Sequence, residues 1–164
     1  MRLISLILAL FVLLAAHSIA FAQENTPSRI EVSGGQYDIN DNFDTWEARL
    51  DYKFGTALVW DIHPFVGVTL TGDDAVYGYA GLAYDWEFAN NWYFIPSFAA
   101  GAYADGDGKD LGHAIEFRSQ VGFAYEFENQ HRLGAFVSHI SNASLDDKNP
   151  GTEEAVLTYS IPVQ

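Results

Sequence analysis

Residues 45–54, TWEARLDYKF, alternate strictly between apolar and polar side chains. Successive side chains of a β-strand point to opposite sides, so this alternation sorts the segment into two faces. The apolar face consists of Trp46, Ala48, Leu50, Tyr52 and Phe54, and the polar face of Thr45, Glu47, Arg49, Asp51 and Lys53. The segment therefore predicts a strand between an apolar environment and a wet or charge-paired one.

Seven further segments have a similar, less regular pattern, and clusters of Gly, Asn and Asp separate them at hairpin spacing. They are residues 29–37, 61–71, 76–88, 92–103, 111–127, 132–141 and 153–163. In the sixth segment of the chain, Leu111 and Ile115 begin an apolar face that continues to Phe127. No stretch has a convincing helical period, so we expect eight strands.

Eight such strands fit two architectures, a soluble up-and-down barrel with an apolar interior or a membrane barrel with an apolar exterior. Aromatic residues gather near the strand ends, as a membrane interface requires. The polar faces carry pairs such as Glu47 with Arg49, and most segments exceed the ~9–11 residues that cross a bilayer. We therefore predict an all-β fold, an eight-stranded antiparallel up-and-down transmembrane β-barrel.

The amino-terminal 22 residues have the pattern of a cleaved signal peptide. Arg2 precedes the apolar run ISLILALFVLLAA, and Ala20-Phe21-Ala22 supplies the small residues of a cleavage site. A retained membrane helix fits less well, because the apolar run is short. We expect residues 1–22 to be removed and residues 23–164 to form the barrel domain. With the amino terminus in the periplasm, connections 72–75, 104–110 and 142–151 would face the cell exterior.

Composition excludes several classes of function. The chain has 22 acidic and 8 basic residues, a formal charge of −14, and such an acidic chain is a poor candidate for binding nucleic acid. It has no cysteine, so disulfides and thiolate metal sites are excluded. Residues 105–110, DGDGKD, resemble a calcium loop but lack its distant glutamate and flanking helices, so we interpret them as a flexible acidic loop. Neither a metal nor a cofactor is expected.

Polar residues interrupt the last two predicted strands. Counting by two from Val137 assigns His139 and Ser141 to the lipid-facing side, and counting back from Ala155 assigns Glu153 to the same side. Glu154 then points inward. Because these two strands are hairpin neighbours, the three outward residues have the types and placement of a serine hydrolase site: nucleophile, base and orienting carboxylate. On residue types alone, ordinary residues at the barrel rim are the commoner interpretation.

The stretch HISNAS followed by NPGTE, residues 139–144 and 149–153, resembles the carboxy-terminal signature of the lipid A 3-O-deacylase (PagL) family. The resemblance implies an eight-stranded outer-membrane barrel with Ser141 as nucleophile, His139 as general base and Glu153 as its orienting partner. It also implies an oxyanion hole from the backbone amides of Asn142 and Ser144. At residue 144 the family often has glycine, which adopts an unusual turn more freely than serine.

This resemblance implies a serine esterase of the outer membrane that removes an ester-linked 3-O-hydroxyacyl chain from lipid A. Its expected partners are lipid A, as part of lipopolysaccharide, and the surrounding outer-membrane lipids. Two other functions fit the strand pattern alone: a structural or adhesive membrane barrel without enzymatic activity, and a periplasmic lipid-binding barrel. The pattern does not select a monomer over a homo-oligomer.

Overall fold

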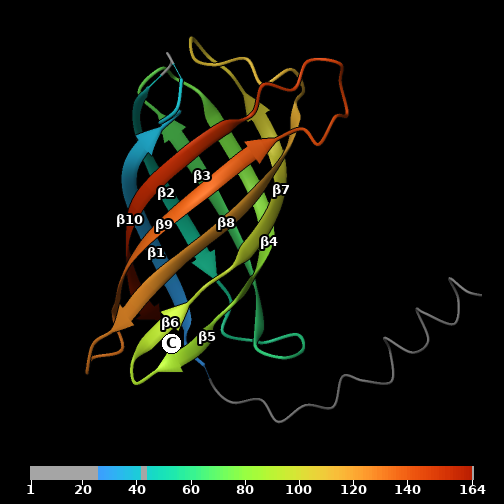
Figure 1. Cartoon of the computed structure of the whole chain (residues 1–164). Coiled ribbons are helices and arrows are strands. Elements are labelled where there is room, and N and C mark those ends of the chain that lie inside the picture. Colours follow the sequence, from blue (N-terminus) through green and yellow to red (C-terminus); the bar gives the residue numbers. More distant parts are fainter. Residues whose placement is uncertain (1–25, 42–43, 164) are drawn as a thin grey trace, which may run out of the picture.

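The computed structural model describes residues 26–41 and 44–163, and the described chain forms one closed antiparallel β-barrel (Figure 1). The predicted signal peptide, residues 1–22, lies outside the described residues. The strands are β1 (Ser28–Tyr37), β2 (Thr45–Lys53), β3 (Ile62–Thr71), β4 (Val76–Tyr84), β5 (Trp86–Ala89), β6 (Trp92–Phe94), β7 (Ser97–Ala104), β8 (Ile115–Glu126), β9 (Arg132–Ser141) and β10 (Thr152–Val163).

The wall of the barrel consists of eight strands in the order β8-β7-β4-β3-β2-β1-β10-β9, and the pairing of β8 with β9 closes the ring. All neighbours along this ring are antiparallel. The longer connections 105–114 and 142–151 lie at one end, which we call the loop end, and the carboxy-terminal end of the chain lies at the other (Figure 1). The predicted eight-stranded transmembrane barrel is confirmed.

Two of the eight predicted strands are each interrupted once, so that β4 continues into β5 and β6 into β7. The register is the same on both sides of the second interruption: Phe94 pairs with Phe123 and Ser97 with Gln120. The Ile95 amide donates to the Gly122 carbonyl at 2.9 Å in the same ladder. Pro96 has no N–H to donate, which accounts for the break at that position. The hairpin β5–β6 is therefore an extension of the barrel wall.

The two faces of the wall have the distribution that a membrane barrel requires. Trp46 and Leu50 point outward and are 60% and 53% exposed, whereas Glu47 and Arg49 between them are buried inside. The same alternation holds along β9 and most of β10. The charged faces predicted for the strands therefore line the lumen. No helix among the described residues has the length and hydropathy needed to cross a membrane.

Charge pairs and aromatic rings fill the lumen. Asp85 pairs with Lys53 at 3.0 Å and with Arg132, while Glu126 pairs with Arg29 and Arg132, each at 2.7 Å. One interior cavity in this region has a volume of about 30 Å³, which is room for roughly one water molecule. The interior is thus a packed core stabilised by ion pairs.

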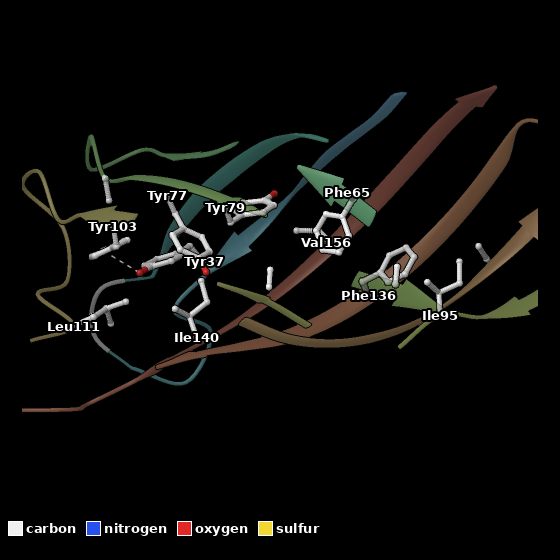
Figure 2. Close-up of a cluster of buried hydrophobic side chains, with 14 residues drawn as sticks. Tyr37, Phe65, Tyr77, Tyr79, Ile95, Tyr103, Leu111, Phe136, Ile140 and Val156 are labelled. Carbon is white, nitrogen blue, oxygen red and sulfur yellow. Dashed lines mark hydrogen bonds between the residues drawn. The ribbon is translucent and has the colours of Figure 1, made fainter. Parts of the chain in front are cut away.

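Buried apolar side chains extend along the lumen, and one group of them lies near the loop end (Figure 2). Tyr37 and Tyr103 join their hydroxyl groups at 3.0 Å, and Leu111 and Ile140 are 1% and 0% exposed. The alternation in the sequence predicts Leu111 on the lipid-facing side of a strand beginning at residue 111. That prediction is wrong, because β8 begins at Ile115 and the preceding loop turns Leu111 into the mouth of the barrel.

Candidate active site

His139 on β9 and Glu153 on β10 lie directly opposite each other in the ladder of these strands. His139 Nδ1 and Glu153 Oε1 are 3.1 Å apart, and the side chains are 50% and 41% exposed on the outer wall. Because an ionised carboxylate only accepts hydrogen bonds, we assign the imidazole proton to Nδ1. Nε2 is then free to accept a proton, as a general base must be.

Glu154, one residue further along β10, points into the lumen and is fully buried. Its carboxylate forms an ion pair with Arg49 at 2.8 Å and accepts a hydrogen bond from the Ser138 hydroxyl at 2.6 Å. The predicted register of the last two strands is therefore confirmed. Glu153 faces the lipid side beside a histidine, whereas Glu154 belongs to the interior charge network.

Ser141 ends β9, two residues beyond His139 and on the same face of the strand. Thr152 pairs with Ile140, so one further step of the ladder places Gly151 opposite Ser141. A Cβ atom on Gly151 would lie 2.8 Å from Cε1 and 3.3 Å from Nε2 of His139. The Nε2 edge of the imidazole therefore faces the row of Ser141 and Gly151. No hydrogen bond joins the Ser141 hydroxyl to His139 among the described residues.

Gly151 has a second reason to be glycine, since its φ is +66°. An L-residue with a Cβ is strained in this left-handed region. The NPG turn before the last strand thus ends in a residue that combines a left-handed backbone with close approach to the imidazole.

Residues 142–144 follow Ser141 in a tight turn. Asn142 is fully buried, and Ala143 and Ser144 have left-handed φ values of 53° and 63°. The backbone N–H of Asn142 donates to Asn149 Oδ1 at 3.1 Å, whereas the N–H of Ser144 has no hydrogen-bond partner among the described residues. Ser144 therefore adopts the turn that glycine would adopt more freely, and its amide is open to a ligand.

The Asn142 side chain ties this turn to the neighbouring loop. Its Nδ2 group donates to the carbonyl oxygens of Leu111 at 3.0 Å and Lys148 at 2.8 Å. Lys148 also pairs with Asp110 at 2.6 Å on the surface. The hydrogen bonds of Asp110 with Lys148 and with the Gly112 amide lower the pKa of this carboxyl.

Two adjoining grooves run along the outer wall from this site. The first, about 500 Å³, is lined by His139 and Glu153 together with Val121 and Val137. The second, about 680 Å³, shares both valines and continues between Ala135 and other small or apolar side chains of β1, β8 and β10. Small residues on the lipid-facing side of these strands leave the space. The polar side chains of His139 and Glu153 thus lie at the start of an apolar groove.

Comparison with known proteins identifies the family. The model of the family "Lipid A 3-O-deacylase (PagL)" matches residues 34–162, most of the chain. The chain belongs to the lipid A 3-O-deacylase (PagL) family. The resemblance inferred from the motif is confirmed. The family and the barrel fold together imply an outer-membrane location.

Curated members of the PagL family are similar to part of this chain. A protein named lipid A deacylase PagL from Bordetella bronchiseptica is 33% identical over 63 residues, which are 38% of this chain and 34% of that protein. Its namesake from Pseudomonas aeruginosa is 34% identical over 55 residues, 34% of this chain and 32% of that protein. The aligned part of the chain thus spans about a third of the length of these curated relatives.

A solved structure extends the likeness to the whole barrel. The crystal structure of the outer membrane enzyme PagL superposes with a TM-score of 0.61 at 18% identity, covering 82% of this chain and 99% of that one. At this low identity, the similarity shows that the two proteins share a fold.

One polar residue beside His139 does not stand out in the sequence. Ser119 on β8 pairs with His139 on the side opposite Glu153, is exposed, and lines the same groove. Its signal is a break in the apolar face of β8, where a serine stands between Phe117 and Val121. The row Ser119–His139–Glu153 therefore crosses three strands of the outer wall.

Proposed function

We propose that this protein is an outer-membrane serine esterase that removes the ester-linked 3-O-hydroxyacyl chain of lipid A. The observation that carries the proposal is the pairing of His139 with Glu153 on the lipid-facing wall, with Nε2 directed toward the row of Ser141. Membership of the PagL family supports the same reaction.

In the acylation step, Ser141 Oγ attacks the ester carbonyl while His139 Nε2 accepts the hydroxyl proton. Glu153 holds the Nδ1–H side of the ring and stabilises the imidazolium that forms. When the tetrahedral intermediate collapses, the C–O bond to the sugar breaks, and the leaving oxygen takes the proton from Nε2. The acyl chain is then an ester of Ser141.

In the deacylation step, His139 removes a proton from water, and the resulting hydroxide attacks the acyl ester. Collapse of this second intermediate releases a hydroxy fatty acid and returns the proton to Ser141 Oγ. His139 lies two residues before the end of β9, next to the connection 142–151, and we propose that water reaches the site from the membrane surface at this end.

The developing oxyanion needs N–H donors. The amide of Ser144 is open in this structure, whereas the Asn142 amide is held by Asn149 Oδ1 at 3.1 Å. We propose that the oxyanion engages Ser144 N–H and displaces the Asn149 side chain from Asn142 N–H. Asn149 is exposed, so its amide group has room to turn outward.

The substrate is placed by the grooves of the outer wall. We propose that the scissile ester lies at the row of Ser141 and His139 and that its acyl chain follows the groove past Val121 and Val137. An apolar groove that begins at a hydrolytic row suits a lipid presented from within the bilayer. The amino-terminal 22 residues would serve as the export signal that brings the chain to the outer membrane.

Mass spectrometry of lipid A from a host that lacks deacylase activity tests the function. Expression of the wild-type protein should remove the mass of one hydroxyacyl chain, and Ser141→Ala should leave lipid A intact, since loss of the nucleophile typically costs ~10⁶-fold in kcat. Heat-modifiable gel migration verifies that both barrels are folded. Unchanged lipid A with folded wild-type protein would contradict the proposal.

A further inference from the structure

The one basic residue of the acidic segment DGDGKD, Lys109, is buried. Lys109 is only 7% exposed, and its ammonium group lies 2.7 Å from Asp38 Oδ1 and 3.0 Å from Asp41 Oδ2. The Tyr103 hydroxyl donates to the Lys109 carbonyl at 2.8 Å. This corrects the expectation of a flexible acidic loop, because the segment inserts its lysine into the mouth of the barrel.

Lys109 stays charged in this position. Burial alone lowers its pKa, but the hydrogen bonds and charges of Asp38 and Asp41 raise the pKa above the ordinary value for lysine. Asp38 is fully buried and has a left-handed φ of 58°. A charged lysine is therefore the counterion of a carboxylate that follows β1 directly.

Asp38 connects this ion pair to the start of β10. Its Oδ1 atom accepts a hydrogen bond from the Thr152 hydroxyl at 2.8 Å. The next residue, Ile39, donates its backbone N–H to the Glu153 carbonyl at 3.1 Å. Residues 38–39 thus hold residues 152–153 through one side-chain and one backbone hydrogen bond.

The carboxylate of Glu153 depends on this backbone support. Within the described part of the chain, His139 is its one hydrogen-bond partner, and the side chain is 41% exposed. A half-exposed carboxylate with one partner is oriented mainly by where its backbone lies. A small displacement of residue 153 would therefore change the contact with Nδ1 directly.

We infer that Lys109 is a positioning residue for Glu153, acting through Asp38 and Thr152 to fix the strand from which the carboxylate reaches His139. This inference rests on the proposed function, in which Glu153 orients the general base. Lys109 touches none of the reacting groups and acts from inside the barrel mouth, whereas Glu153 acts from the outer wall.

The test is Lys109→Met, which keeps most of the length of the side chain and removes its charge. We expect kcat for lipid A deacylation to fall roughly 10–100-fold, the range for a displaced catalytic group, with KM little changed. The labelling rate of Ser141 by a fluorophosphonate probe should fall in parallel, and this readout does not depend on the lipid substrate. Lys148→Met is the control, because it removes an exposed ion pair that the same loop, 105–114, makes with loop 142–151, and it should leave both rates unchanged.

A double-variant cycle separates positioning from general loosening of the structure. In the Glu153→Ala background, Lys109→Met should cause no further fall in kcat, because the residue through which it acts is gone. An additional fall of the same size would overturn the inference, and so would wild-type kcat in folded Lys109→Met. If Lys109→Met does not fold, Thr152→Val replaces the hydroxyl group with a methyl group and should show a smaller loss with the same non-additivity.

The outcomes distinguish this inference from the proposed function. Full activity of Glu153→Ala would contradict the proposed triad, and the positioning role with it. Loss of activity in Glu153→Ala combined with full activity in Lys109→Met would contradict the positioning role alone.

Discussion

The hairpin β9–β10 carries two polar rows that face opposite ways. On the outer wall, Glu153 is 41% exposed and bonds His139, its one hydrogen-bond partner in the described chain. In the lumen, Glu154 is fully buried, with Arg49 at 2.8 Å and Ser138 at 2.6 Å. Two identical side chains, one peptide bond apart, thus occupy entirely different chemical environments. In this barrel, the face of the strand on which a glutamate lies, rather than its residue type, distinguishes the carboxylate proposed for catalysis from the structural one.

The comparison of the two glutamates is tested most strongly by replacing each of them with alanine in turn. Glu153→Ala should lower kcat by ~10²–10⁴-fold, as loss of an orienting carboxylate does, with little change in stability. Glu154→Ala should leave kcat within a few-fold but lower the free energy of unfolding, because it removes one partner of a buried ion pair. Since Arg49 keeps Glu47 at 2.9 Å, the loss should lie at the low end of ~3–5 kcal/mol.

Kinetics on lipid A and urea unfolding in lipid vesicles measure the two quantities separately. A similar loss of kcat in both variants, with both proteins folded, would contradict the division between the two faces.

The division between the two faces could be predicted from the sequence because the period of a strand is two. A slip of one residue would expose Arg49 and Glu154 to lipid, so the alternating pattern specifies the register strongly. The same period assigns His139, Ser141 and Glu153 to one face of the wall. This assignment requires only that the last two strands pair as a hairpin.

Features of the loop end could not be predicted in this way. The ion pair of Lys109 with Asp38 joins residues 71 positions apart, and no local pattern encodes it. The position of Leu111 could not be predicted either, because its burial depends on how the loop 105–114 folds into the mouth of the barrel. The hydrogen bond from the Asn142 amide to Asn149 is likewise a property of the folded turn. Such contacts depend on backbone paths that alternation does not constrain.

A smaller effect is expected when Gly151, which lies beside His139 on the outer wall, is replaced. Gly151→Ala places a methyl group 2.8 Å from His139 Cε1 in a backbone with φ of +66°. The ring must turn away from Ser141 or the backbone must shift, so kcat should fall roughly 10-fold or more. Gly106→Ala is the control, since it has a left-handed φ of +56° but packs against Asp73 and Asp74.

The rate of serine labelling by a fluorophosphonate probe, measured against pH, checks this effect. A change in the rate for Gly151→Ala that Gly106→Ala does not show supports a specific effect on His139. Equal changes in the two variants would indicate backbone strain instead.

The smallest effect is expected from a substitution in the turn that follows Ser141. Ser144 has a left-handed φ of 63°, which an L-residue reaches at a cost of ~1–2 kcal/mol. Ser144→Gly removes this strain, and the greater freedom of glycine in the unfolded chain offsets part of the gain. We therefore expect a rise in stability of at most ~1 kcal/mol, with deacylation retained because glycine keeps the backbone N–H proposed to bind the oxyanion. Urea unfolding and steady-state kinetics measure both quantities. A fall in stability would mean that the Ser144 side chain stabilises the turn, and a large loss of kcat would mean that its hydroxyl contributes to the reaction.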